Sequence, residues 1–395
     1  MKNDKIKYLV GAHTPRVFPL EPYSNEVCEF LDDLSGVLRK DITAKKYSDI
    51  MTLAFWCRKA SINKMKHEFE DGKYHLGRGL VFHITPSNVP INFAFSYFFG
   101  ILSGNANIVR TPSKDFVQVK IICDTIQNVL KNSKYKIIKE STLIISYEKD
   151  KGITDYYSSI CDARIIWGGN EAIRNIRQSP VKEKSVEIVF ADRYSLALIN
   201  SNAIIQTSNH EIQDIANKFY NDTYLMDQNA CSTPHLILWI GEDKQGAKNK
   251  FWENIVKAAG KYDLAPIKVV DKYTQLCELS IEHDDIAKIT KHRNLLYVVD
   301  MKQIPDDMCS LRGKFGLFFQ HDIEDMEQIA SKITDKVQTL TYYGINKEEL
   351  IDFVIQNHLQ GIDRIVPIGE ALNMGVHWDG YDIIGMLSRQ ISVSS

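Results

Sequence analysis

Several features that this sequence lacks exclude whole classes of protein. No run of about 18 apolar residues occurs in its 395 residues, which argues against a transmembrane helix. The N-terminus is basic, but no apolar stretch of secretory-signal length follows it. The formal net charge is only −2, so no overall field attracts nucleic acid or an anionic membrane.

Recognisable metal and nucleotide motifs are also missing. The seven cysteines are scattered, odd in number and form no C-x-x-C pair. This pattern argues against a disulfide framework and a metal site, and it fits the reducing conditions of a cytoplasmic protein. The chain has no G-x-x-x-x-G-K loop for ATP and no G-x-G-x-x-G dinucleotide fingerprint.

Short apolar runs alternate with helical patterns from residue 81 to residue 190. Helical periodicity occupies the first 75 residues, and five predicted strands follow at 81–85, 107–110, 142–147, 163–167 and 185–190. Strands separated by helices indicate an α/β fold with a doubly wound, largely parallel sheet. Such sheets usually hold dinucleotides at the carboxyl ends of their strands.

A second α/β pattern follows residue 200. Its predicted strands are 235–240, 295–299, 316–320 and 337–343, and its predicted helices include 245–261 and 325–332. We therefore expect helices and a Rossmann-like dinucleotide-binding domain in residues 1–200 and a second α/β domain in residues 201–365. Residues 366–395 are expected to pack back on the first domain or to form an oligomer contact.

Residues 226–235 read Met-Asp-Gln-Asn-Ala-Cys-Ser-Thr-Pro-His. This polar, turn-forming stretch lies between an amphipathic helix pattern and an apolar strand pattern, and such loops often present reactive groups. A thiolate is a strong nucleophile that suits acyl transfer from a thioester, so Cys231 is a candidate nucleophile. His235 begins an apolar strand, which favours packing over a role as the base.

The segment Thr85-Pro86-Ser87-Asn88-Val89-Pro90 connects a strand to a helix. The prolines stop the strand, and Ser87 or Asn88 is expected to cap a helix that Pro90 opens. An asparagine there can also turn its amide toward an oxyanion, an interaction of about 3 kcal/mol in enzymes from which it has been removed. Asn88 is therefore either an oxyanion donor or only a helix cap.

Two more strand ends carry candidate ligand contacts. Gly104 and Asn105 are expected to end a helix in a left-handed residue. The next strand delivers Arg110 to the sheet edge, with Lys114 four residues on, and these cations suit a ribose or phosphate unless the segment is only a solvated loop. Trp167-Gly168-Gly169-Asn170 either lets the backbone approach a cofactor or forms a plain turn.

Four motifs together resemble a known family. The motifs are HITPSNVP, LSGNANIVRTPS, DQNACSTP and GIDRIVPIGEALNMGVHWDGYDIIGMLSR. They resemble the LuxC-type acyl-CoA reductases, which are the fatty-acid reductases of bacterial luminescence and a branch of the aldehyde dehydrogenase superfamily. The resemblance implies an aldehyde-dehydrogenase-like fold of two α/β domains.

The resemblance also implies roles for individual residues. Cys231 matches the acyl-accepting cysteine and Asn88 the oxyanion asparagine. Ser113, followed by Lys114, stands where NAD-preferring relatives often carry a glutamate, which implies NADPH rather than NADH. The residues implied to bind the cofactor are Thr85, Pro86, Arg110, Ser113, Lys114, Gly168 and Gly169.

The implied activity is reduction of an acyl-CoA thioester to an aldehyde through a thioacyl-enzyme at Cys231. The water-activating Glu-Leu-Gly-Gly-Lys segment of hydrolytic relatives is absent, and Glu187 is either its relic or structural. The resemblance further implies a homo-oligomer and an acyl-transferring or acyl-activating partner protein. Phe93, Phe95 and their aromatic neighbours line either an acyl tunnel or a core. The alternatives are an oxidative aldehyde dehydrogenase, hydrolytic or CoA-acylating, and a non-catalytic scaffold.

Overall fold

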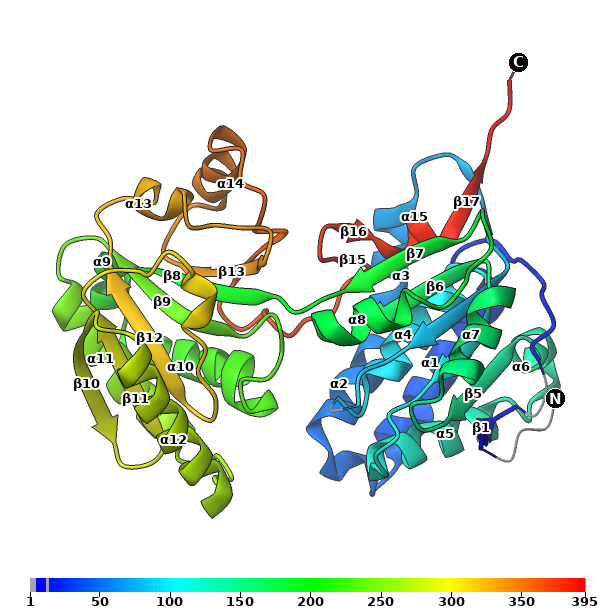
Figure 1. Ribbon diagram of the computed structural model, residues 1–395, viewed down its shortest axis with the longest axis horizontal. Coiled ribbons are helices and arrows are strands. Elements are labelled where there is room, and N and C mark those ends of the chain that lie inside the picture. The colour runs from blue at the N-terminus through cyan, green and yellow to red at the C-terminus, as the bar shows by residue number, and fades with distance from the viewer. Residues whose placement is uncertain (1–4, 12–13, 88, 395) are drawn as a thin grey trace. The chain divides into compact units, whose positions relative to one another are not determined.

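A computed structural model describes residues 5–11, 14–87 and 89–394. The chain forms two compact units, which Figure 1 shows as ribbons. Unit 1 comprises Met1–Ala191 and Gly375–Ser395, and unit 2 comprises Asp192–Met374. Among the described residues, no helix combines the length and the apolar character needed to cross a membrane.

Unit 1 is built on a six-stranded sheet with the order β1-β5-β4-β3-β6-β7. All neighbouring strands in it are parallel except β1, which is antiparallel to β5 at one edge. The strands are β1 (Lys7–Val10), β3 (Leu80–Ile84), β4 (Ala106–Arg110), β5 (Thr142–Ser146), β6 (Ala163–Trp167) and β7 (Val186–Phe190). The predicted doubly wound, largely parallel sheet is therefore confirmed.

Helices cover both faces of this sheet. Leu80 and Phe82 of β3 pack with Tyr157 of α7 on one face, whereas His83 contacts Ser96 of α4 on the other. This alternation follows from the two-residue period of a strand. The helices of unit 1 are α1 (Asn25–Lys40), α2 (Ser48–Trp56), α3 (Lys59–Phe69), α4 (Asn92–Leu102), α5 (Val117–Val129), α6 (Lys136–Glu140), α7 (Lys151–Ile160), α8 (Asn170–Ile176) and α15 (Ile383–Leu387).

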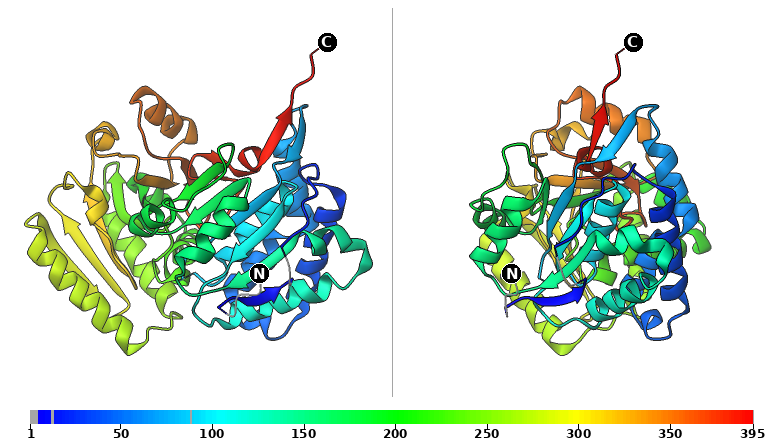
Figure 2. Two further views of the ribbon diagram at one scale, coloured as in Figure 1. Left: turned by 45° about the vertical axis from the view of Figure 1, so that its right-hand side comes forward. Right: turned by 90° about the vertical axis from the view of Figure 1, so that its right-hand side faces the viewer.

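The end of the chain completes unit 1. Strand β17 (Ser388–Ile391) runs antiparallel beside β2 (Tyr74–Gly77), as Figures 1 and 2 show. The short strands β15 (His377–Trp378) and β16 (Tyr381–Asp382) form a hairpin just before α15. The Asn105 amide donates to the Leu387 carbonyl at 2.9 Å, which ties the segment after β16 to the loop before β4.

Unit 2 contains a seven-stranded sheet with the order β10-β11-β12-β9-β8-β13-β14. Its strands are β8 (Tyr194–Asn200), β9 (Pro234–Ile240), β10 (Ile286–His292), β11 (Leu296–Met301), β12 (Leu317–Asp322), β13 (Val337–Tyr343) and β14 (Arg364–Pro367). Its helices are α9 (Ser201–Gln206), α10 (Asn209–Thr223), α11 (Lys244–Ala259), α12 (Pro266–Glu282), α13 (Glu327–Ala330) and α14 (Lys347–Gln356).

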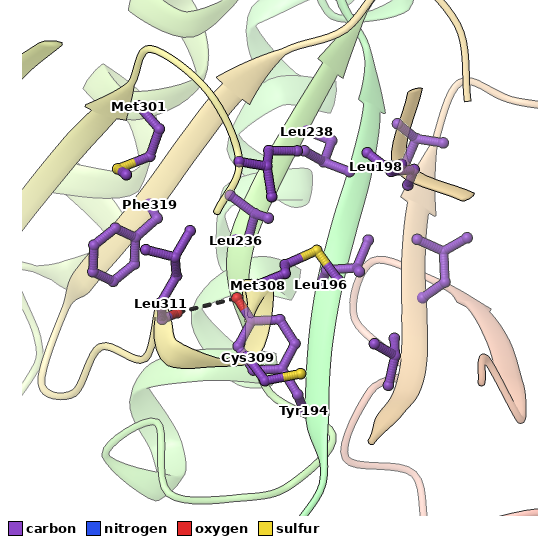
Figure 3. Close-up of a cluster of buried hydrophobic side chains, with 14 of the residues drawn as sticks. Tyr194, Leu196, Leu198, Leu236, Leu238, Met301, Met308, Cys309, Leu311 and Phe319 are labelled. Atoms are coloured by element: carbon purple, nitrogen blue, oxygen red, sulfur yellow. Dashed lines mark hydrogen bonds between the residues drawn. The ribbon is translucent and has the colours of Figure 1, made fainter. Parts of the chain in front are cut away.

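Both faces of the second sheet are buried. Ile199, Ile237 and Trp239 pack with residues of α9, α10 and α11. Leu196 and Leu238 point to the opposite face, where α12, α13 and α14 contribute apolar side chains. Figure 3 shows part of this second layer, including the hydrogen bond of 3.1 Å from the Tyr194 hydroxyl to the Leu311 carbonyl.

Three local predictions about the ends of α4 can be compared with the structure. Gly104 adopts a left-handed φ of +81° after α4, as expected for a glycine that ends a helix. The predicted helix start at Pro90 is wrong, because α4 begins at Asn92 with Ile91 in the N-cap position. No side chain caps this described helix end, so the predicted cap by Ser87 is also wrong.

A buried chain of hydrogen bonds joins α4 to the first sheet. Trp167 Nε1 donates to Ser96 Oγ at 3.0 Å, and Ser96 lies 2.8 Å from His83 Nδ1. His83 Nε2 lies 2.9 Å from Asn107 Oδ1. Burial lowers the pKa of His83 to about 4, so this histidine is a neutral packing residue. A Cβ on Gly100 would lie only 1.8 Å from Asn107 Oδ1. This network of hydrogen bonds therefore requires glycine at position 100.

Gly100→Ala is therefore expected to destabilise the protein by about 1–3 kcal/mol, because the new methyl group overpacks the core. Urea unfolding of the full chain measures this change. Gly36→Ala in α1 is the matched control, since its Cβ meets nothing within 4 Å. The control should be neutral or more stable by about 0.5–1 kcal/mol, the ordinary helical effect. Equal unfolding free energies for the two variants would contradict the requirement for glycine at position 100.

Candidate active site

Cys231 lies in a turn at the amino end of β9 and is half-buried. Asp227 and Gln228 precede it with left-handed φ angles of +55° and +60°, which are unusual for residues other than glycine. The Gln228 amide stabilises this backbone because its Oε1 accepts from the backbone N–H of Gly316 at 2.6 Å. Its Nε2 donates to the Leu317 carbonyl at 3.1 Å. The turn is therefore anchored to the start of β12.

Side chains from two neighbouring strands contact Cys231. Ser195 Oγ donates to the Cys231 carbonyl at 2.7 Å, and Gln338 Nε2 donates to Cys231 Sγ at 3.4 Å. Ser195 and Gln338 are the second residues of β8 and β13, which are parallel neighbours. Sequence reasoning missed both residues, because it predicted no strand at residues 194–200 and did not predict which strands lie beside the cysteine.

The first part of the long motif near the chain end contacts β13 and α10 within unit 2. Arg364 Nη1 donates to Thr339 Oγ1 at 3.4 Å and to the Ala371 carbonyl at 3.1 Å. Asp222 accepts the backbone N–H groups of Gly369 at 2.6 Å and Ala371 at 3.0 Å. These contacts hold residues 369–371 against α10 and link them to the strand that carries Gln338.

Asp222 also contacts the cysteine turn through its backbone. Thr233 Oγ1 donates to the Asp222 carbonyl at 2.8 Å. Burial raises the pKa of the Asp222 carboxyl to about 7, even though the N–H groups of Gly369 and Ala371 favour its charged form. The sequence offered no signal for Asp222, because it occurs in an ordinary amphipathic helix pattern.

His235 packs beneath the turn and is not placed as a base. Its Nδ1 accepts the backbone N–H of Gly313 at 3.3 Å, and its ring stacks on Tyr194. Burial, followed by the charge of Arg312, lowers its pKa to about 3, so it is neutral at physiological pH. The expectation that His235 serves packing is confirmed.

The predicted cofactor segments gather at one edge of the first sheet. Arg110, Thr85 and Gly168 stand at the carboxyl ends of β4, β3 and β6, which are adjacent parallel strands. The chain order reverses between β3 and β6, and dinucleotides bind at such reversals in open α/β sheets. Asn88, the predicted oxyanion donor, lies outside the described residues.

Arg110 offers an unsatisfied donor at this edge. Its guanidinium lies 4.6 Å above the Tyr147 ring, and its Nη2 donates to the Tyr147 carbonyl at 3.4 Å. Its buried Nε has no hydrogen-bond partner among the described residues. The Thr85 hydroxyl donates to the Arg110 carbonyl at 2.7 Å, which joins the ends of β3 and β4.

The remaining residues of the predicted cofactor set follow β3, β4 and β6 in the chain. Pro86 and Ser113 are half-buried, and Lys114 is exposed. A Cβ on Gly169 would meet nothing within 4 Å, so its backbone is open to approach. An unsatisfied guanidinium nitrogen, an exposed ammonium and an open glycine fit a phosphorylated dinucleotide. The structure thus brings together the described members of the predicted cofactor set.

Glu187 has a structural environment in unit 1. Its carboxylate pairs with Arg164 Nε at 2.9 Å and with Arg177 Nε at 2.7 Å. Because Arg164 is buried, removing this partner would leave a charge unpaired in the protein interior. These ion pairs favour the structural interpretation of Glu187 over a relic general base.

The aromatic run on α4 is core. Phe93, Phe98 and Phe99 are fully buried, and the Trp56 ring lies 5.8 Å from that of Phe99. These side chains pack among themselves and against α2. They therefore belong to the hydrophobic core and do not line an acyl tunnel. Among the described residues, no group of three or more His, Cys, Asp or Glu side chains is arranged to hold a metal ion.

Comparisons with known proteins agree with this architecture. Residues 19–390 match the family described as acyl-CoA reductase (LuxC). A long-chain acyl-protein thioester reductase of Aliivibrio fischeri is 26% identical over 74% of this chain and 58% of its own length. That of Photobacterium phosphoreum is 23% identical over 80% of this chain and 62% of its own length. The chain thus spans less than two thirds of these relatives.

Solved structures show the fold. A 1-pyrroline-5-carboxylate dehydrogenase of Thermus thermophilus aligns with a TM-score of 0.64 at 11% identity, covering 94% of this chain and 82% of that one. Aldehyde dehydrogenase 21 of Physcomitrella patens aligns with a TM-score of 0.64 at 9% identity, covering 93% of this chain and 85% of that one. The chain therefore has the aldehyde dehydrogenase fold and belongs to the acyl-CoA reductase (LuxC) family.

Proposed function

We propose that this protein reduces an acyl-CoA thioester to an aldehyde, with Cys231 as the nucleophile and NADPH as the reductant. The observation that carries the proposal is the setting of Cys231 in a chain of the acyl-CoA reductase family. The residue is half-buried, its carbonyl is held by Ser195, and its sulfur is contacted by Gln338.

The first step is acyl transfer to Cys231. The thiolate attacks the thioester carbonyl, a new carbon–sulfur bond forms at Cys231 Sγ, and the bond to the CoA sulfur breaks. CoA leaves as a thiolate that takes up a proton from solvent. In this proposal the Asn88 amide and the backbone N–H of Cys231 donate to the oxyanion. Cys231 then holds the acyl group as a thioester.

Residues of unit 1 hold the cofactor in this proposal. The donors are the Arg110 guanidinium, the Lys114 ammonium and the Ser113 hydroxyl, with Thr85 and Pro86 beside them. The backbone of Gly168 and Gly169 allows the phosphates to approach. When bound, reduced nicotinamide supplies the two electrons that convert the acyl group to an aldehyde. Cleavage of the carbon–sulfur bond then releases the aldehyde and returns Cys231 as a thiolate, the form that attacks the next thioester.

The placement of Glu187 supports reduction over hydrolysis. A hydrolytic enzyme needs a base that activates water against the thioacyl group. Glu187 is occupied by Arg164 and Arg177, and His235 is buried and neutral. Neither side chain is placed to act as that base.

The acyl donor is a second element of the proposal. The description of the matching family names acyl-CoA as the acyl donor, whereas the relatives are named as acyl-protein thioester reductases. Both donors present the same thioester carbonyl to a thiolate. We therefore include an acyl-transferring or acyl-activating protein as a second source of the acyl group. Labelling from acyl-CoA alone and from an acylated partner protein distinguishes the two sources.

Substitution of Cys231 tests the proposal. Cys231→Ser should lose thiol-linked label from radiolabelled long-chain acyl-CoA and reduce NADPH-dependent aldehyde formation on the order of 10³-fold or more. The matched control is Cys277→Ser, since Cys277 is exposed on α12 and should not matter. A Cys231→Ser variant that labels and turns over normally would end the proposal.

Two other outcomes would favour the alternative functions. Carboxylate formed from added aldehyde would favour an oxidative aldehyde dehydrogenase. A protein that neither takes up acyl label nor responds to the cofactor would favour a non-catalytic scaffold.

A second substitution tests cofactor choice. Lys114→Ala should weaken NADPH binding about 5–10-fold, as expected for loss of roughly 1 kcal/mol from one exposed charge pair, and leave NADH binding unchanged. Ser113→Glu should weaken NADPH binding further, because a carboxylate repels the 2′-phosphate. Nicotinamide fluorescence titration gives both dissociation constants. The control is Lys120→Ala, since Lys120 is also exposed. Equal preference for the two nucleotides in the unsubstituted protein would refute the assignment.

A further inference from the structure

We propose that Arg364, Thr339 and Gln338 form a directional relay that fixes an N–H donor on Cys231 Sγ and so activates that sulfur. This inference rests on the proposed function, in which Cys231 is the nucleophile. Gln338 touches the reacting sulfur, whereas Thr339 and Arg364 act through it as positioning residues. The three residues join the cysteine to β13 and β14, which lie side by side in the sheet.

The direction of the relay follows from donor chemistry. A guanidinium can only donate, so Thr339 Oγ1 accepts from Arg364 Nη1 at 3.4 Å. The Thr339 proton is then directed at Gln338 Oε1, which lies 3.2 Å away. With its oxygen engaged, the Gln338 amide turns its nitrogen toward the sulfur, 3.4 Å from Cys231 Sγ. The opposite amide orientation would place Gln338 Nε2, a donor, against the Thr339 hydroxyl and leave the hydroxyl proton without this acceptor.

Burial makes the relay rigid. Gln338 and Thr339 are fully buried, so neither side chain exchanges its partners readily with water. Arg364 is held independently, because its Nη2 donates to the Asn373 carbonyl at 3.2 Å and its Nη1 to the Ala371 carbonyl at 3.1 Å. The guanidinium position is therefore set by the loop after β14 and not by the cysteine.

A fixed amide donor distinguishes the two forms of the sulfur. An ordinary cysteine titrates near pH ~8.5 and is mostly a thiol at neutral pH. An N–H donor stabilises the thiolate, whereas the amide nitrogen cannot accept the thiol proton. The hydroxyl of Ser195 holds the Cys231 carbonyl at 2.7 Å, so the turn has an anchor that does not depend on the relay. Removing the relay should therefore change the reactivity of the sulfur more than its position.

The test is the pH dependence of Cys231 alkylation by iodoacetamide in the full chain, followed by mass spectrometry of its peptide. Gln338→Met and Thr339→Val should move the midpoint of alkylation to higher pH by about 0.5–1 unit, which corresponds to about 3–10-fold slower alkylation at pH 7. Gln338→Glu should move it further, because a carboxylate disfavours a thiolate. Thr341→Val is the matched control, since Thr341 lies buried on the same strand and donates to the Leu196 carbonyl.

The outcomes separate this inference from the proposed function. Alkylation needs no thioester or nucleotide, so shifted midpoints support the relay even if acyl-CoA fails to label Cys231. Unchanged midpoints in both Gln338→Met and Thr339→Val overturn the relay, even where acyl labelling of Cys231 succeeds. An equal shift in Thr341→Val also overturns it, because the effect would then reflect general disturbance of β13. Thermal unfolding of each variant establishes that the comparison is made on folded protein.

Discussion

The parallel pairing of β13, β8 and β9 is the constraint on which the site in unit 2 depends. Ser195 pairs in register with Pro234 of β9 and with Thr339 of β13, so the three strands begin at one edge of the sheet. The turn before β9 carries Cys231 to this edge. A slip of one residue in any of the three strands would turn its side chains to the opposite face and separate the hydroxyl, the amide and the sulfur.

The second consequence of this pairing is that weak contacts act together. Each hydrogen bond around Cys231 contributes only about 1 kcal/mol net, and the one to the sulfur is long. The contacts nevertheless come from three separate segments, namely α10, β8 and β13. Left-handed residues at 227 and 228 persist because this surrounding structure holds them.

Much of the fold could be predicted from the sequence, because the strands of unit 1 are short apolar runs bounded by turn residues. Helix α12 and strand β10 are among the elements that were not predicted. Helix α12 exposes Ile267, Val270 and Ile281, so its apolar residues do not mark a single buried face. Strand β10 reads Ile-Ala-Lys-Ile-Thr-Lys-His and lies at a sheet edge, where a polar composition hides the pattern.

The candidate site was partly predictable for a related physical reason. Cys231, Arg110 and Gly168 stand next to predicted strands, so local sequence was enough to single them out, and their roles remain predictions. Ser195 and Gln338 lie inside strands, and their relevance depends on strand order, which local sequence does not encode. Asp222 was missed for the same reason, since its contact with residues 369–371 spans about 150 residues of chain.

The discontinuity of unit 1 has a consequence for synthesis on the ribosome. Its β2 pairs with β17, and its Asn105 binds the Leu387 carbonyl, whereas all of unit 2 lies between these partners in the chain. Unit 2 can therefore form its own sheet while strands β1–β7 of unit 1 still lack β17 and the segment that contains Leu387. The nascent chain must keep β2 and the Asn105 loop available until residues 375–391 emerge, so the first unit to start is the last to finish.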